Sequence, residues 1–114
     1  MEAVCRGVAE VGGISIGLLP EADYTQANDF VTVPIATGIG EARNALVARA
    51  SFCLVAIGNS YGTLSEVALG LQFGKSVFGI HGAAQVYGVV HFDTVEAIVD
   101  RVAAAVLLLD RASG

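Results

Sequence analysis

Short apolar runs alternate along the chain with stretches of helical periodicity, and this alternation restricts the fold more than any other feature. Continuous apolar runs at 52–57 and 76–80 are typical of strands that are buried on both faces. Helical patterns follow at 63–73 and from Asp93 to about residue 109. Strands that alternate with helices pair in parallel, so we predict an α/β protein with a doubly wound parallel sheet and helices on both faces.

The first part of the chain continues this pattern. A helical spacing of apolar residues starts at Met1 and ends at Gly12 and Gly13, strands are expected at 14–19 and 31–35, and a helix is expected at 41–50. Pro34 lacks a backbone N–H, which places the second of these strands at a sheet edge. A last strand is expected at 89–92, before a helix capped by Asp93.

Composition and charge exclude several classes of protein. The 114 residues allow a single domain, 1–114, and 54% of them are apolar, which predicts a compact fold. The net charge is −5 and no basic block is present, so nucleic acid is not an expected partner. The apolar run at 102–109 is much shorter than the roughly 18 residues of a membrane span. We therefore expect a soluble, cytoplasmic protein that does not bind a membrane.

The cysteines and histidines give no sign of a metal or a disulfide. Cys5 and Cys53 lie in apolar surroundings without a CxxC spacing, which predicts reduced thiols. His81 and His91 are ten residues apart and lack ligand-like neighbours. We expect neither a metal site nor a resident cofactor.

Two glycine turns follow predicted strands and lead into predicted helices. In a doubly wound fold, ligands bind at these carboxyl ends of strands, where backbone N–H groups at a helix start can hold a phosphate. The first turn contains Thr37, Gly38 and Gly40; the second contains Gly58, Asn59, Ser60, Tyr61, Gly62 and Thr63. We predict that both turns bind a ligand phosphate. The alternative is that they only connect a strand to a helix.

Two charged residues beside these turns are candidates for chemistry. Arg43 heads the apolar face of its predicted helix, where a guanidinium needs an anion, either a ligand phosphate or the carboxylate of a structural ion pair. Glu66 follows Thr63 by three residues, so it is either a functional carboxylate or the partner in a capping box. Tyr61 has two interpretations as well, stacking on a base or covering the end of the sheet.

The motifs together resemble one known family. The segments TGIGEARN at 37–44 and YGTLSE at 61–66, with the opening MEAVCRG at 1–7, are similar to the LOG-like family, long labelled lysine decarboxylases. The resemblance implies a Rossmann-like nucleotide-binding fold and a phosphoribohydrolase, which cleaves the N-glycosidic bond of a nucleoside 5′-monophosphate. It also implies catalytic roles for Arg43 and Glu66. The decarboxylase label finds no support, because Lys75, the only lysine, lies away from both turns.

The sequence departs from the family pattern at two places. Gly58-Asn59-Ser60 stands where the family has Pro-Gly-Gly, and Asn44 follows Arg43 where a lysine is usual. The second departure resembles the branch that contains molybdenum cofactor carrier proteins. The alternative is therefore a noncatalytic carrier or sensor of a phosphorylated ligand.

The resemblance also implies missing structure. Family members begin with a strand, a helix and another strand before the helix that starts here at Met1, and those strands lie between 14–19 and 52–57 in the sheet. We thus predict a domain that is truncated at its N-terminus, as a fragment, a shortened gene model or a chain that re-pairs its strands in an oligomer. Unpaired edges and the family resemblance both favour a homodimer or higher homo-oligomer.

Overall fold

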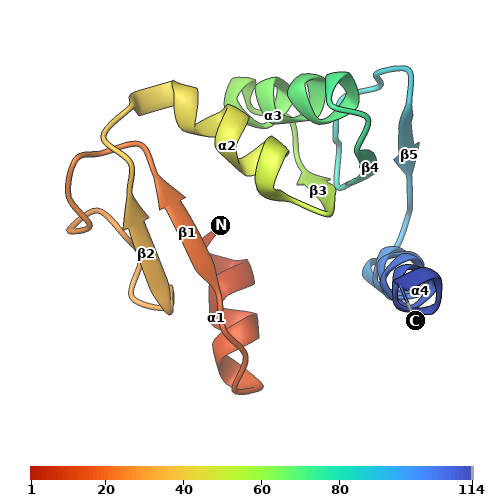
Figure 1. The fold of residues 1–114 in the computed structure, drawn as a ribbon, viewed down its shortest axis with the longest axis horizontal. Coiled ribbons are helices and arrows are strands. Elements are labelled where there is room, and N and C mark those ends of the chain that lie inside the picture. The colour runs from red at the N-terminus through yellow and green to blue at the C-terminus, as the bar shows by residue number, and fades with distance from the viewer. Residues whose placement is uncertain (114) are drawn as a thin grey trace. The chain divides into compact units, whose positions relative to one another are not determined.

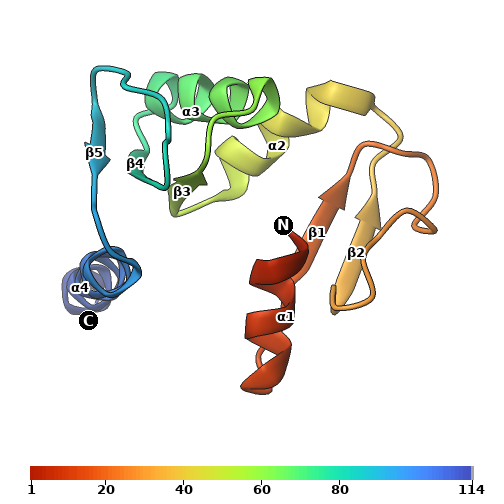
Figure 2. The ribbon, with the colours of Figure 1, turned by 180° about the vertical axis from the view of Figure 1, so that it is seen from behind.

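The computed structural model describes residues 1–113 and confirms an α/β fold with parallel strands. Figures 1 and 2 show the order of its elements, in which short strands alternate with helices. The chain divides into two compact units, the first running from Met1 to Val47 and the second starting at Ala48. Each unit holds its own parallel sheet, and each is described by itself.

The first unit contains a two-stranded sheet with one helix before it. Its elements are α1 (Glu2–Glu10), β1 (Ile16–Leu19), β2 (Val33–Ala36), the short 3-10 helix η1 (Gly40–Ala42) and the start of α2 (Arg43–Ala50). The Val33 N–H donates to the Ser15 carbonyl at 2.9 Å, so alternate residues of β2 face β1 and Pro34 faces outward. Because the N–H that proline lacks belongs on the unpaired side, the predicted edge position of this strand is confirmed.

The second unit contains a three-stranded sheet with a helix on each face. Its elements are β3 (Cys53–Ile57), α3 (Tyr61–Gln72), β4 (Ser76–Ile80), β5 (Val89–His91) and α4 (Val95–Ser113), and β4 is the central strand. Helix α3 packs on β3 and β4, and α4 packs on β4. The side chains of β4 are buried alternately toward the two helices, which is why its apolar run is continuous.

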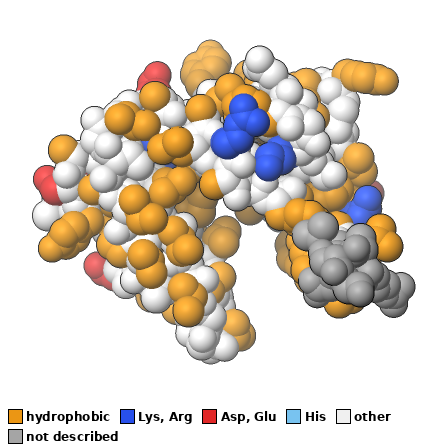
Figure 3. Space-filling model, in the orientation of Figure 1, with side chains coloured by type: hydrophobic (Ala, Val, Ile, Leu, Met, Phe, Trp, Pro, Cys, Tyr) orange, Lys and Arg blue, Asp and Glu red, His pale blue; other side chains and the backbone are white. Residues whose placement is uncertain are grey.

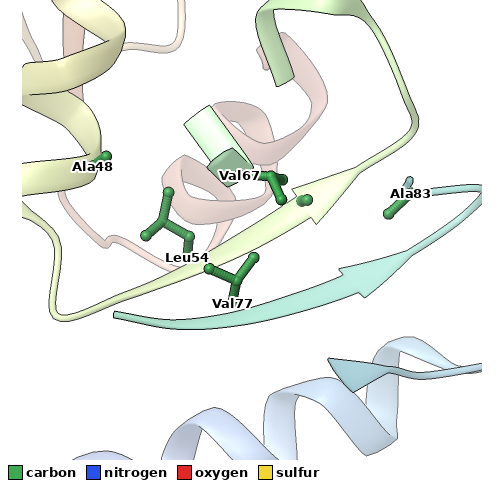
Figure 4. Close-up of a cluster of buried hydrophobic side chains, with 6 residues drawn as sticks. Ala48, Leu54, Val67, Val77 and Ala83 are labelled. Carbon is green, nitrogen blue, oxygen red and sulfur yellow. The ribbon is translucent and has the colours of Figure 1, made fainter. Parts of the chain in front are cut away.

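Two apolar clusters hold the second unit together. The larger, on the α3 side, is shown in Figure 4 and consists of Ala48, Leu54, Ala56, Val67, Val77 and Ala83. The smaller joins Phe78 and Ile80 of β4 to Ile98 of α4. Helix α3 approaches the sheet closely at Gly70, where an added Cβ would lie only 2.9 Å from the Leu54 Cδ1 atom. A residue with a Cβ at this position would require the Leu54 side chain to shift.

The strands of residues 1–113 form two sheets, with strand orders β1-β2 and β3-β4-β5. Within the described residues, β1 and β3 each pair on one side only. These are the two strands that the sequence analysis expected to lie beside absent neighbours. In the first unit, Figure 3 shows apolar side chains gathered on the surface around α1, β1 and β2, and Ile16 of β1 is 65% exposed. The single, truncated domain itself stays a prediction.

One predicted helix cap is wrong by one residue. The hydroxyl of Thr94, not the carboxylate of Asp93, accepts the hydrogen bond from the Ala97 N–H, at 3.1 Å, and α4 begins at Val95. Both residue types cap helices well, and the path of the chain after β5 decides which one is in place.

The structure also bears on the predictions about the cysteine thiols and about membrane spans. Cys5 and Cys53 are free, as predicted. Burial raises the pKa of the Cys53 thiol, an effect that the nearby Arg101 charge partly opposes. Over the part of the chain that the structure describes, no helix has both the length and the apolar character needed to cross a membrane.

Candidate functional site

The second glycine turn lies at the carboxyl end of β3, beside the end of β4. The Gly58 N–H donates to the Ile80 carbonyl at 3.2 Å, which joins the two strand ends. Gly58 has a φ of +75°, a left-handed conformation that residues with a Cβ adopt at a cost. The glycine thus turns the chain directly from β3 toward the start of α3.

Ser60 is the N-cap of α3. Its Oγ accepts a hydrogen bond from the Thr63 N–H at 3.1 Å, and the two hydroxyl oxygens are 2.9 Å apart. Tyr61, Gly62 and Thr63 therefore form the first turn of the helix, which starts two residues earlier than predicted. A capping box with this N-cap has Thr63 at its third position, so the alternative in which Glu66 caps Thr63 is wrong. Glu66 lies half-buried in the second turn of α3.

Four successive backbone N–H groups are open at this helix start. Among the described residues, the amides of Asn59, Ser60, Tyr61 and Gly62 donate to no protein acceptor. All four residues are exposed, and Tyr61 is 93% exposed, so its side chain does not cover the end of the sheet. These N–H groups also stand at the positive end of a 12-residue helix. This combination is suited to holding an anion, because the N–H groups are free to donate to it and the helix dipole favours negative charge.

A hollow of about 280 Å³ lies at the carboxyl ends of β4 and β5. Its lining residues are Ile80, His81, Gly82, Ala83, Gln85, His91, Phe92 and Asp93. His81 and Gly82 both have left-handed backbones, with φ of +54° and +80°. The hollow therefore offers imidazole, amide and carboxylate groups to the edges of a small polar molecule.

No motif in the sequence predicts Gln85 or Asp93 as a binding residue. The available signal was the rule that ligands bind at the carboxyl ends of parallel strands, applied to the residues after 76–80 and 89–92. No three His, Cys, Asp or Glu side chains within the described residues are grouped so that they could hold a metal ion.

The first glycine turn uses its N–H groups within the first unit. The Thr37 N–H donates to the Leu19 carbonyl at 3.1 Å, and those of Gly38 and Gly40 donate to the Glu21 and Pro20 carbonyls, each at 2.9 Å. Gly38 and Gly40 have φ of +67° and +62°. The glycines here let the turn bond to the chain that follows β1, and the role of Thr37, Gly38 and Gly40 in ligand binding stays a prediction.

Arg43 is held by neutral groups in the first unit. Its Nη1 donates to the Leu18 carbonyl at 2.6 Å and its Nε donates to the buried Asn44 side chain at 2.9 Å. Within the first unit the guanidinium thus bonds to a backbone carbonyl and a side-chain amide. A phosphate or a carboxylate as its anion stays a prediction. Arg43 belongs to the first unit and Glu66 to the second, and their predicted cooperation stays a prediction.

The parallel α/β fold, with glycine turns at the carboxyl ends of its strands, defines a Rossmann-like protein. Within that class, the chain belongs to the SLOG cluster4 family, whose sequence profile matches residues 1–106. The LOG-like resemblance inferred from the glycine-turn motifs is thereby confirmed.

Two solved structures share the fold. The molybdenum cofactor binding protein of the phototrophic bacterium Rippkaea orientalis superposes with a TM-score of 0.86 at 28% identity, covering 93% of this chain and 71% of that one. The molybdenum cofactor carrier protein of Chlamydomonas reinhardtii gives a TM-score of 0.78 at 33% identity, covering 90% and 68%. The chain is thus similar to the branch that the residue after Arg43 indicated.

A curated relative is an uncharacterized protein of Archaeoglobus fulgidus, 36% identical over 100 residues. The match covers 88% of this chain and 66% of the relative, so the chain spans about two thirds of the length of that protein.

Proposed function

We propose that the protein binds and carries a small phosphorylated ligand of the molybdenum cofactor kind, without transforming it. The observation that carries this proposal is the row of open N–H groups from Asn59 to Gly62 at the start of α3. A phosphate placed there receives several hydrogen bonds and meets the positive end of the helix. The similarity to two proteins named for binding or carrying molybdenum cofactor supports the same ligand class.

The neighbouring hollow accounts for the rest of such a ligand. Gly58 joins the phosphate turn to the end of β4, whose next residue, His81, lines the hollow. A pterin ring has several hydrogen-bond donors and acceptors along its edge. The Gln85 amide and the Asp93 carboxylate offer both kinds of partner to that edge.

In this proposal neither Arg43 nor Glu66 cleaves the ligand. Thr37, Gly38 and Gly40 then act through their backbone, by fixing the end of β2 within the first unit. Gly58, Asn59, Ser60, Tyr61, Gly62 and Thr63 form the phosphate-binding turn itself. The N–H groups of Thr37, Gly38 and Gly40 already donate to carbonyls, one of which belongs to the acidic Glu21. We therefore place the phosphate at the second turn.

The competing function is phosphoribohydrolase activity on nucleoside 5′-monophosphates. It requires a carboxylate that supports positive charge on the ribose and activates water, the role that the family resemblance gives to Glu66. Both structural relatives described above are named as molybdenum cofactor proteins, and for this reason carriage is the preferred proposal.

One experiment separates the two functions. The purified chain is incubated with a panel of nucleoside 5′-monophosphates, and separately with molybdenum cofactor released from a molybdoenzyme. Release of ribose 5-phosphate and retention of molybdenum after gel filtration are measured. We expect retained molybdenum and no ribose 5-phosphate, with the wild type and with Glu66→Gln. Turnover that Glu66→Gln abolishes would instead establish the hydrolase.

A further inference from the structure

Asp93 lies between two anchored residues at the carboxyl end of β5. On one side, the Phe92 N–H donates to the Gly79 carbonyl of β4 at 2.9 Å, and the centroid of the Phe92 ring is 5.9 Å from that of Phe78. On the other side, the hydroxyl of Thr94 caps α4. The backbone of Asp93 is therefore held in place without a contribution from its own carboxylate.

The carboxylate of Asp93 has no role in the local structure. Among the described residues it makes no hydrogen bond and no ion pair, because Thr94 supplies the cap of α4. Asp93 is exposed, and it lines the hollow at the carboxyl ends of β4 and β5. A carboxylate on an anchored backbone, without a protein partner, is able to accept hydrogen bonds from a ligand with both of its oxygens.

The chain after β4 supplies hydrogen-bond donors to the same hollow. His81 and Gly82 line it, both are exposed, and within residues 1–113 neither backbone N–H donates to a protein acceptor. His81 is the one described residue other than glycine with a positive φ, at +54°. Such strained conformations are concentrated at functional sites. The hollow thus combines free N–H groups with a free carboxylate.

This combination of groups matches one edge of a pterin ring. That edge has a carbonyl oxygen, a ring N–H and an amino group side by side. A carboxylate accepts from the ring N–H and the amino group together, while the ring carbonyl accepts from a backbone N–H. Guanine has the same three groups in the same order. Adenine presents a nitrogen lone pair in place of the ring N–H, so a carboxylate in this position loses one hydrogen bond to adenine and is repelled by the lone pair.

The size and place of the hollow suit a ring and not a whole nucleotide. Its volume of about 280 Å³ lies just below the range of about 300–1,000 Å³ that is typical of pockets for drug-sized ligands. The Gly58 N–H joins the phosphate-binding turn to the Ile80 carbonyl, and the next residue, His81, already lines the hollow. A phosphate at the turn therefore leaves its attached ring close to Asp93.

We propose that Asp93 is the specificity-determining residue of the hollow and selects rings with a 2-amino-4-oxopyrimidine edge. Guanine nucleotides then compete with the carried pterin for the site, whereas adenine nucleotides do not. This inference rests on the proposed function for the position of the ligand, because it takes the phosphate to lie at the amides from Asn59 to Gly62. It adds a second class of ligand that displaces the first.

Equilibrium binding of GMP, IMP and AMP to the purified chain tests the proposal. We expect GMP to bind at least about tenfold more tightly than AMP, because the carboxylate makes one more hydrogen bond to guanine. IMP keeps the ring N–H but lacks the amino group, and it should bind with an intermediate affinity. GMP should also displace molybdenum cofactor at concentrations at which AMP does not. Equal affinities for GMP and AMP would overturn the proposal.

Asp93→Asn assigns the selectivity to this residue. An asparagine side chain donates to the ring nitrogen of adenine and accepts from its amino group, so the ratio of GMP affinity to AMP affinity should fall at least about tenfold. The circular dichroism spectrum should be unchanged, since Thr94 still caps α4. Asp100→Asn is the matched control, because it makes the same change of charge at an exposed position of α4 outside the hollow. Selectivity that survives in Asp93→Asn, or that is lost in Asp100→Asn, contradicts the proposal.

Tyr61→Pro separates this inference from the proposed function. It removes an N–H of the phosphate-binding turn, so it should weaken GMP and AMP by the same factor and leave their ratio as in the wild type. If neither affinity changes while the ratio persists, the phosphate position is wrong and the selectivity of Asp93 is upheld. If the protein retains molybdenum cofactor but does not distinguish GMP from AMP, carriage is upheld and the selectivity of Asp93 is refuted.

Discussion

The two glycine turns follow strands in the same way but differ in where their N–H groups point. In the turn after β2, the amides of Thr37, Gly38 and Gly40 all donate to carbonyls at the end of β1 or in the chain that follows it. In the turn after β3, the amides from Asn59 to Gly62 donate to no described protein group. In the first turn, glycine lets the backbone N–H groups donate to nearby carbonyls. In the second turn, the N–H groups that follow the glycine remain open for a ligand. A glycine-rich turn is therefore evidence for a phosphate site only once its hydrogen bonds are counted.

The sharpest test of this difference removes one open N–H. Tyr61 is the first residue of α3, a position that suits proline because its N–H has no partner within the helix. A hydrogen bond to a charged group is worth about 1.5–3 kcal/mol, so Tyr61→Pro should weaken binding of the molybdenum cofactor roughly ten- to a hundredfold. Equilibrium binding measures the effect. Tyr61→Ala, which keeps the N–H, is the control, and equal affinities for the two variants would show that this amide does not contact the ligand.

A smaller effect is expected from the N-cap of the second turn. Ser60→Ala removes the oxygen that accepts from the Thr63 N–H, and it should lower the free energy of unfolding by about 1 kcal/mol. Ser60→Asn, which keeps a capping oxygen, should be close to wild type. Urea unfolding followed by circular dichroism distinguishes them. A stable alanine variant would mean that Ser60 does not hold the start of α3.

A substitution in the first turn should lower the free energy of unfolding and leave the ligand affinity unchanged. Gly40 has a φ of +62° with open space where a Cβ would lie, so Gly40→Ala costs backbone strain of about 1 kcal/mol without a collision. Gly7 lies inside α1, also with open space, and Gly7→Ala should stabilise by up to about 1 kcal/mol. Thermal melts measure whether each variant is less or more stable than the wild type. Loss of ligand affinity in a folded Gly40→Ala protein would show that the first turn contacts the ligand directly.

The smallest effect concerns the loop between β1 and β2. Hydrogen bonds from the Thr25 hydroxyl and N–H lower the pKa of the exposed Asp23 carboxyl. A carboxyl whose pKa is lowered on folding stabilises the protein above its ordinary pKa near 4, and this contribution is lost as the pH falls through the folded value. Thr25→Val should therefore reduce the melting temperature slightly at about pH 7 and not at about pH 2. An equal reduction at both pH values would assign the effect to packing.

The local pattern of the sequence predicted the elements well. The strand at 76–80 has the predicted bounds, and the apolar run at 52–57 contains β3. Pro34 lies in a strand that pairs on one side only within the described residues. These features depend on hydrophobic periodicity and on the missing N–H of proline, which are properties of neighbouring residues. The family motifs around Arg43 and Glu66 were equally local, and they led to the correct family.

The partners of individual polar groups were decided by the tertiary structure. Ser60 and not Thr63 caps α3, and Thr94 and not Asp93 caps α4, because the path of the chain at each helix start selects among adjacent residues of similar chemistry. Arg43 bonds to the carbonyl of Leu18, 25 residues away, a contact that no spacing in the sequence encodes. The tertiary structure also decides that the amides after β2 donate to carbonyls, whereas the amides after β3 have no described protein acceptor. Apolar periodicity is written along the chain, whereas a hydrogen-bond partner is set by which distant segments the fold brings together.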